Sequence, residues 1–234
     1  VSLPLGIDVY VDVTDGQAEN ICRVQARRWS AQLLDSFVPG SQARSIGLTP
    51  TEMLTRMRRI LPSLRRLRRM QKPMPMTGMR EELFGTLDSA PWLPAQVPSA
   101  GAKCSARGLA KLAAAMANGG TINGQQVLGE MGHAALHAEP IVRKMTIFDN
   151  RFTQAGLALF RDADAATGPL EAGISLGRGG FYGWMGLGGS GFQWHPQKRI
   201  GFAYVPTALN PTDLFNERGK SYQQAIVECL GAAL

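Results

Sequence analysis

The stretch that decides the fold is Gly183-Trp184-Met185-Gly186-Leu187-Gly188-Gly189-Ser190-Gly191-Phe192-Gln193-Trp194-His195-Pro196, followed by Arg199-Ile200-Gly201-Phe202-Ala203-Tyr204-Val205. Its first part is rich in glycine and aromatic residues and predicts an extended strand. The dipeptide His195-Pro196 predicts a tight turn, because proline has no amide to donate to a strand ladder. The apolar run over 200–205 predicts a returning strand, so the stretch predicts an antiparallel hairpin.

Elements on both sides of this hairpin follow the α+β order of helices first and then an antiparallel sheet closed by a helix. Ser105 is a candidate N-cap, Gly119-Gly120 a helix end and Asn123-Gly124 a tight-turn dipeptide. Thr49 or Thr51 is a candidate cap for a helix upstream. The predicted strands cover 152–160, 179–192 and 200–208, and the main predicted helices cover 17–34, 106–118, 130–138 and 216–234.

In two of these helices, the spacing of apolar residues predicts which residues share one face. In the helix over 17–34, Ile21, Val24, Ala31 and Leu34 are expected to be buried. In the last helix, Tyr222, Ile226, Val227 and Leu230 share one face. The chain divides into a helical-lobe portion over 1–98 and a helix, sheet and C-terminal helix over 99–234.

Composition narrows the class of protein. The chain has 234 residues, of which 44% are hydrophobic, as in globular proteins. The sequence contains no run of about 18 apolar residues, so it predicts no membrane-spanning helix. Cys22, Cys104 and Cys229 are odd in number and far apart, which favours buried thiols in a reducing compartment over a disulfide framework or zinc site. The start at Val1, without methionine or a signal-peptide pattern, suggests a processed, cleaved or split product.

The net charge of +7 comes from one segment. This basic segment has no acidic residue, and the rest of the chain is close to neutral. This segment is either a solvated helix face or a contact surface for a protein, an anionic lipid or RNA. It holds no aromatic residue for base stacking, which argues against specific RNA recognition. The segment's basic residues are Arg56, Arg58, Arg59, Arg65, Arg66, Arg68, Arg69 and Lys72.

Several motifs, in their order along the chain, resemble the serine β-lactamase-like family of class C β-lactamases, DD-peptidases and related esterases. They are SARGLAKLAAAMANGGTINGQQVLGE from Ser105, FTQAGLALF from Phe152 and the hairpin that opens at Gly183. The opening LPLGI from Leu3 is similar to the turn after the family's second motif. The resemblance implies the C-terminal half to two-thirds of a β-lactamase/transpeptidase-like α+β domain, an antiparallel sheet flanked by helices plus a helical lobe.

The resemblance also implies a catalytic apparatus of which most is missing. The family forms an acyl-enzyme on the serine of Ser-x-x-Lys, with a tyrosine of a Tyr-x-Asn motif handling protons. No serine of this chain has lysine three places on, and no tyrosine has asparagine two places on. The glycines align Trp184 with the Lys or His of the third motif, Met185 and Gly186 with its remaining positions, and Leu187 with an oxyanion N–H. An indole does not titrate, so the third motif is degenerate.

Other candidates have a functional and a structural interpretation. Ser190 is either a substitute nucleophile or a small residue on a crowded strand. His195 is either a general base or a surface turn residue. His133 and His137 have metal-compatible spacing but no third ligand. Around the third motif, Phe181, Tyr182 and Trp184 either fill the site or stack on a ligand.

Two functions remain open, besides that of a degenerate cleft that still binds a small acyl or peptide ligand. The first is a catalytically degenerate β-lactamase-like protein that serves as a structural or accessory subunit, attached through the basic segment. The second is the C-terminal piece of an active serine hydrolase whose Ser-x-x-Lys lies on another chain. Other protein subunits are the expected partners, and no cofactor or metal is expected. Composition fits the cytosol or a mitochondrial compartment, and mitochondrial members of the family favour the second of these.

Overall fold

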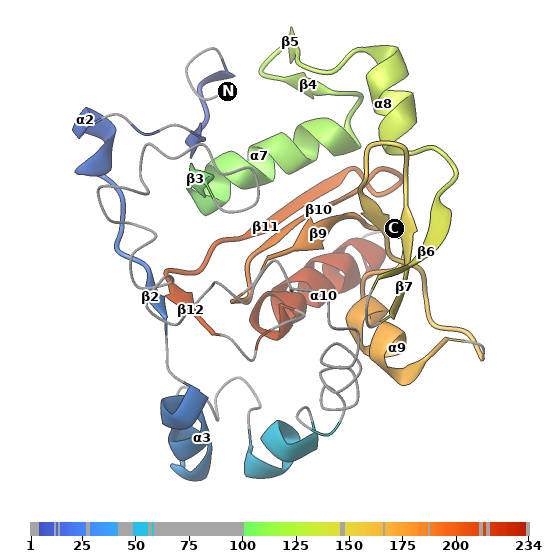
Figure 1. The fold of residues 1–234 in the computed structure, drawn as a ribbon. Coiled ribbons are helices and arrows are strands. Elements are labelled where there is room, and N and C mark those ends of the chain that lie inside the picture. Colours follow the sequence, from blue (N-terminus) through green and yellow to red (C-terminus); the bar gives the residue numbers. More distant parts are fainter. Residues whose placement is uncertain are drawn as a thin grey trace, which may run out of the picture.

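A six-stranded antiparallel sheet forms the centre of the structure (Figure 1). The computed structural model describes residues 5–11, 13, 15–26, 29–41, 49–55, 58, 101–145, 148–165, 167–186, 188–210, 213 and 216–232. The strand order is β11-β10-β9-β8-β7-β6, so neighbours in sequence are neighbours in the sheet. The strands are β6 Ile141–Met145, β7 Phe148–Phe152, β8 Ala158–Leu159, β9 Tyr182–Met185, β10 Gly191–His195 and β11 Ile200–Tyr204.

Helices cover both faces of this sheet, which makes three layers (Figure 1). On one face lies α7 (Ala106–Ala117), which packs with Tyr182 and Trp194. On the other face lies α10 (Glu217–Ala232), which adds Val227 to a core that includes Phe181 and Phe202. Two short helices, α8 Glu130–Leu136 and α9 Pro169–Ser175, complete the C-terminal part.

The helix α7 begins and ends as its sequence predicts. The Oγ of Ser105 accepts a hydrogen bond from the N–H of Gly108 at 3.0 Å, which is an N-cap contact. Gly119 and Gly120 follow the helix with φ of 74° and 79°. Gly201 on β11 lets the helix approach closely, because a Cβ there would lie 2.7 Å from the carbonyl oxygen of Ala110. The Asn123-Gly124 turn also forms, between β4 Thr121–Ile122 and β5 Gln125–Gln126.

The deciding stretch forms three strands rather than the two predicted. The predicted strand over 179–192 is broken by a turn between β9 and β10, where Gly188 and Gly189 have φ of 87° and 100°. A side chain at these angles is strained, so the glycines permit the turn. The second turn, after His195, forms as predicted and leads into β11.

Earlier in the chain, the predicted strand over 152–160 is likewise broken into β7 and β8, at Gly156. The strand β6 and the helix α9 were not predicted at all.

The predicted helix over 17–34 is wrong. Its residues form α2 (Asp15–Ala18), β2 (Gln25–Ala26) and the start of α3 (Trp29–Phe37). Leu34, expected to be buried, is 69% exposed. The reason is a contact distant in sequence, because β2 pairs in parallel with β12 (Ala208–Leu209) and this pairing interrupts the helical pattern.

The N-terminal elements are joined to the sheet part of the chain. Besides the pairing of β2 with β12, β1 (Val9–Tyr10) pairs with β3 (Lys103–Cys104). Strands from both sides of the predicted boundary at residue 98 thus pair with one another, while the division itself stays a prediction. The helical residues 50–55 begin where Thr49 accepts a hydrogen bond from the N–H of Glu52, so Thr49 is the cap.

Candidate functional site

The residues that the sequence aligns with the third motif lie at the end of β9 and in the turn after it. Trp184 and Met185 are the last two residues of β9, and Gly186 opens the turn to β10. The preceding Gly183 has φ of 115°, and a Cβ there would collide with the backbone carbonyl oxygen of Phe192 on β10. Only glycine fits at this position, so the backbone next to the motif is specified by its sequence.

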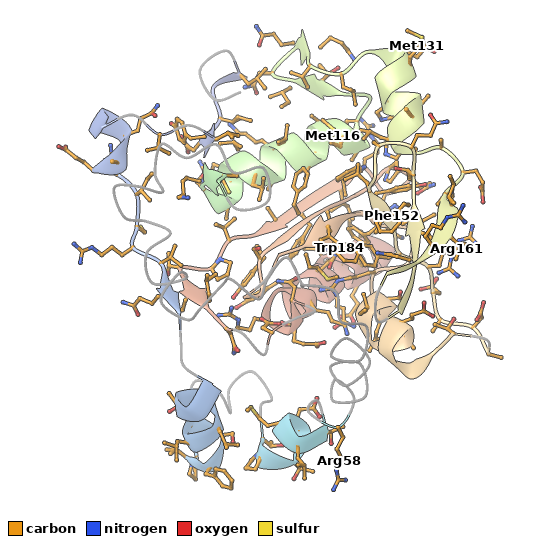
Figure 2. The ribbon with its side chains drawn as sticks, in the orientation of Figure 1. Arg58, Met116, Met131, Phe152, Arg161 and Trp184 are labelled. Carbon is orange, nitrogen blue, oxygen red and sulfur yellow. The ribbon has the colours of Figure 1, made fainter. Side chains whose placement is uncertain are left out.

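Trp184, which the sequence aligns with the titrating side chain of the family motif, packs against its neighbours in the structure. Its ring stacks on that of Phe160, with ring centroids 6.1 Å apart and planes inclined by 22°. It is half-buried against the core cluster of that face. Figure 2 shows Trp184 on the central sheet, far from Arg58 of the basic segment. The contacts favour the filling interpretation of this indole; they leave ligand stacking untested.

The turn from Gly186 to Ser190 is closed by its own backbone. The N–H of Gly186 donates to the carbonyl of Ser190 at 2.9 Å, and the N–H of Gly189 donates to the carbonyl of Gly186 at 3.2 Å. A Cβ on Gly186 would collide with the Oγ of Ser190, so that hydroxyl lies against the motif. Among the described residues, no base forms a hydrogen bond with Ser190, which favours its structural interpretation.

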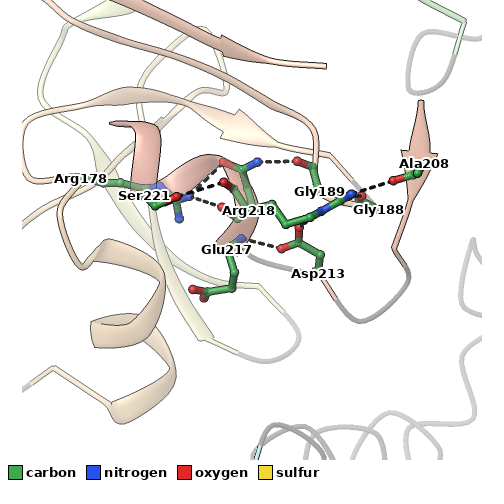
Figure 3. A network of polar contacts seen from close by, with 9 residues as sticks. Arg178, Gly188, Gly189, Ala208, Asp213, Glu217, Arg218 and Ser221 are labelled. Carbon is green, nitrogen blue, oxygen red and sulfur yellow. Dashed lines mark hydrogen bonds and ion pairs between the residues drawn. The ribbon is translucent and has the colours of Figure 1, made fainter. Parts of the chain in front are cut away.

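The guanidinium of Arg218 on α10 holds this turn (Figure 3). Arg218 on α10 donates to the carbonyl oxygens of Gly188 at 2.6 Å and Ala208 at 2.9 Å, and forms an ion pair with Asp213 at 2.8 Å. The Asp213 carboxylate also accepts from the N–H of Glu217 at the start of α10. The turn, β12 and the helix start are therefore tied together through one charged pair.

Asn216 adds a second tie to the same turn. Its Nδ2 donates to the carbonyl of Gly189, and its Oδ1 accepts from Arg178 at 3.2 Å. Its backbone carbonyl accepts from the N–H of Lys220 at 2.9 Å, the first bond of α10, although its φ of 53° is rare for a residue other than glycine. We name Arg178, Asp213, Asn216 and Arg218 the turn clamp.

Arg178 is the most deeply buried charge of the turn clamp. It is fully buried, and it donates to Gln223 at 3.1 Å and to the carbonyl of Ile174 at 3.0 Å. Burial lowers the pKa of Arg178 to about 10, while the charges of Glu217 and Asp213 raise it. The guanidinium stays protonated at neutral pH, so it is held by hydrogen bonds to neutral oxygens and by the field of two carboxylates.

The histidines that the sequence singled out have structural roles. Trp194 donates from Nε1 to the Nε2 of His137 at 2.8 Å, and the Nδ1 of His137 lies 2.9 Å from the carbonyl of His133. Since a tryptophan only donates, His137 carries its proton on Nδ1 and both its nitrogens are used. In the described part of the chain, no three or more His, Cys, Asp or Glu side chains come together in a way that could hold a metal ion. His195 is buried beside Phe181 rather than exposed at the surface as expected.

Some of the remaining site residues predicted from the sequence lie within the described part of the chain, and others lie outside it. Leu187, the predicted oxyanion donor, lies outside the described residues. Arg58 is described and exposed on a helix. The other members of the basic segment lie outside the described residues: Arg56, Arg59, Arg65, Arg66, Arg68, Arg69 and Lys72. Of the cysteines, Cys22 and Cys229 are exposed and Cys104 is half-buried, so the expectation of buried thiols is wrong.

The turn clamp was not found from the sequence. Its residues lie up to 40 positions apart, and none belongs to a motif with recognised spacing. The one local signal is an asparagine and an aspartate just before the last helix, the residue types that favour a helix start. That signal predicts a cap; it does not predict that the same side chains reach back to the turn after β9.

Comparisons with known proteins bear on the fold. No family model and no curated protein matches the sequence. Solved structures do match over nearly the whole chain. The chain has the serine β-lactamase-like fold. The matches include a penicillin-binding protein homolog from Caulobacter crescentus (18% identity, TM-score 0.56), a family VIII carboxylesterase (18%, 0.61) and EstA from Arthrobacter nitroguajacolicus Rue61a (13%, 0.55).

The β-lactamase-like match covers nearly all of this chain but only about half of each solved chain. It covers 98%, 98% and 99% of this chain, but 50%, 49% and 52% of the three solved chains. The chain thus spans about half the length of the structures it matches. The partial fold inferred from the motifs is confirmed, as is its antiparallel sheet flanked by helices. Within the described residues, no helix is both long and apolar enough to span a membrane.

Proposed function

We propose that this chain is a non-catalytic half of a β-lactamase-like domain, which functions as a structural or accessory part of a larger assembly. The observation that carries the proposal is the state of Trp184, a side chain without a titrating group that is stacked on Phe160 at the third-motif position. The sequence supports it, because Ser-x-x-Lys and Tyr-x-Asn are both missing. Without a nucleophile, an oxyanion donor has little to stabilise.

A second function is favoured by the turn clamp. The turn after β9 is held by Arg218 and Asn216 through the carbonyls of Gly188 and Gly189. A turn that only connected two strands would not need a buried charged pair to fix it. The clamp therefore also supports a chain that contributes the third-motif strand to an active serine hydrolase whose nucleophile is supplied by another segment.

The basic segment is the proposed attachment surface of the assembly. Its net positive charge fits an acidic protein surface or an anionic lipid headgroup layer. Arg58, the described member of the segment, is exposed.

Covalent probes of acyl-enzyme chemistry distinguish the two functions. The full chain is incubated with a fluorescent penicillin and with a fluorophosphonate, first alone and then with the polypeptides that copurify with it. The non-catalytic proposal predicts no labelled band in either sample. A labelled partner band favours the hydrolase, and a label on this chain would overturn both functions by revealing a nucleophile such as Ser190. A Ser190→Ala variant then tells whether that hydroxyl is the labelled group.

A further inference from the structure

The helix α3 exposes large apolar side chains while it buries a serine. Leu34 and Phe37 are 69% and 62% exposed, and they lie three positions apart, so they share one face of the helix. Val38, which directly follows α3, is 53% exposed. Ser36 is fully buried, and its hydroxyl donates to the carbonyl of Leu33 at 2.6 Å. The apolar residues at the end of α3 therefore face outward.

The turn after α3 holds these side chains in place. The N–H of Val38 and the hydroxyl of Ser41 both donate to the carbonyl of Asp35, at 3.0 Å and 2.6 Å. The N–H of Ser41 donates to the carbonyl of Val38 at 3.2 Å. The exposed apolar residues are thus presented by a hydrogen-bonded turn, and their outward direction is fixed by the backbone.

The helical residues 50–55 also expose an apolar side chain, and a basic residue follows it. Met53 is 2% exposed, whereas the next residue, Leu54, is 53% exposed. Arg58, four positions after Leu54, is helical and exposed. Figure 1 shows α3 and the helical residues 50–55 at the same end of the molecule, below the central sheet, and Figure 2 shows Arg58 at that end. We name Leu34, Phe37, Val38, Leu54 and Arg58 the lobe patch.

The positive charge of the chain is concentrated in the same part of the sequence as the lobe patch. Residues 29–72 hold nine basic and two acidic residues, so their net charge of +7 equals that of the whole chain. The two acidic residues are Asp35 and Glu52, and both are half-buried. Every other member of the basic segment lies within 14 positions of Arg58 in the sequence. Exposed apolar side chains and positive charge therefore occur together.

We propose that the lobe patch binds the surface of a membrane that carries anionic lipid headgroups. In this contact, the four apolar side chains enter the boundary between headgroups and acyl chains, and Arg58 binds lipid phosphates. Each basic residue near an anionic surface strengthens the attraction, so a run of basic residues fits a surface of uniform negative charge. The inference rests on the proposed function, because it names the partner of the attachment surface.

RNA and an acidic protein are the alternative partners, and both fit the lobe patch less well. Single-stranded RNA is bound by aromatic side chains that stack on bases, and the basic segment contains none. RNA also offers no apolar environment to side chains that are 53–69% exposed. The centre of an interface between proteins is depleted of charged residues, whereas here a run of basic residues directly follows the apolar ones in sequence.

Sedimentation of the full chain with lipid vesicles tests the proposal. One set of vesicles is pure phosphatidylcholine, and the other contains about 30% phosphatidylserine, which gives the surface a negative potential. We expect binding to the second set alone, and weaker binding in about 0.5 M salt, which screens the charges. Arg58→Glu should weaken the binding about tenfold or more by reversing a charge at the surface. Phe37→Ser should weaken it about fivefold or more by removing buried apolar area.

Two variants outside the lobe patch are the matched controls. Arg143→Glu reverses an exposed charge on β6, and Met131→Ser removes an apolar side chain on α8 that is 89% exposed. Both should bind the vesicles within about twofold of the unchanged chain, because neither residue belongs to the contact. Equal melting temperatures of the four variants show that all of them are folded.

The outcomes separate lipid binding from function. Equal binding to both sets of vesicles, no binding to either, or equal weakening by the controls would overturn the lipid surface. Weakening by Arg58→Glu but not by Phe37→Ser would show adsorption by charge alone and overturn the lobe patch. Binding of polyuridylate RNA without binding of vesicles would assign the surface to RNA instead. A chain that binds vesicles and is labelled by the fluorophosphonate would keep the lipid surface and overturn the non-catalytic function, whereas an unbound, unlabelled chain would overturn the lipid surface alone.

Discussion

Removing the guanidinium of Arg218 should destabilise the protein and release the turn after β9. The Arg218→Ala substitution deletes an ion pair of 2.8 Å and two hydrogen bonds to backbone carbonyls. It leaves the Asp213 side chain, 2% exposed, as a buried charge without its counterion. Breaking a buried pair from one side costs about 3–5 kcal/mol, mainly because the remaining charge stays desolvated.

Urea unfolding followed by tryptophan fluorescence and far-ultraviolet circular dichroism measures this loss. With an m-value of about 2 kcal/mol/M, the midpoint should fall by roughly 1.5–2.5 M. Because a domain is stabilised by only about 5–15 kcal/mol, Arg218→Lys is the companion variant in case the alanine variant is unfolded. Lysine keeps the charge beside Asp213 but loses the planar fork that reaches two carbonyls, so we expect a smaller loss.

A double-mutant cycle and a matched control measure how much the ion pair between Arg218 and Asp213 contributes to stability. Removing both charges should cost less than the sum of Arg218→Ala and Asp213→Ala, since no uncompensated charge is left. The control is Arg161→Ala, which breaks an ion pair with Glu139 of 3.8 Å whose side chains are 54% and 89% exposed. That variant should lose about 0.5 kcal/mol or less. If Arg218→Ala loses no more than the control, the reasoning about the turn clamp is refuted.

Three further predictions concern the fold and its pH dependence. Gly183→Ala should cost more than about 2 kcal/mol in urea unfolding, because its Cβ collides with backbone at a φ of 115°; wild-type stability would contradict this. Ser105→Ala should cost about 1 kcal/mol by removing the N-cap of α7, and an unchanged midpoint would show that the cap is dispensable. Burial lowers the pKa of His137 and of His195 from 6.5, so the stability they contribute is present above pH 6.5 and is lost as the pH falls through the folded values. His137→Gln, which keeps an acceptor for Trp194, should make the urea midpoint less dependent on pH between 7.5 and 5; equal slopes would refute this.

Local signals in the sequence predicted local structure well. Ser105, Thr49 and the Asn123-Gly124 turn act within a few residues of themselves, and all three form as expected. The helix over 17–34 failed because β2 pairs with a strand far away in sequence. A pattern of apolar residues carries no information about a partner strand, so tertiary pairing overrode it.

The candidate site shows the same division between near and distant contacts. The residues at the end of β9 were aligned with the third motif from their glycines alone, and that alignment stays a prediction. The turn clamp could not, because Arg178 and Asn216 meet through a contact 38 residues apart in sequence. The break in the predicted strand over 179–192 could have been predicted, because a Gly-Gly dipeptide such as Gly188-Gly189 commonly marks a turn.

The helix α10 has a polar inner face and an apolar outer face: Lys220 and Gln223 are buried, whereas Tyr222, Ile226 and Leu230 are 62%, 39% and 38% exposed. Carbonyls of the turn after β9 point toward the helix start and need donors, which Arg218 and Asn216 supply. Farther along, Gln223 does the same for Gln193 of β10. Because polar side chains occupy the inner face of the helix, its apolar residues Tyr222, Ile226 and Leu230 lie on the outer face. The exposure of these three apolar residues is therefore a consequence of how the turn after β9 is held.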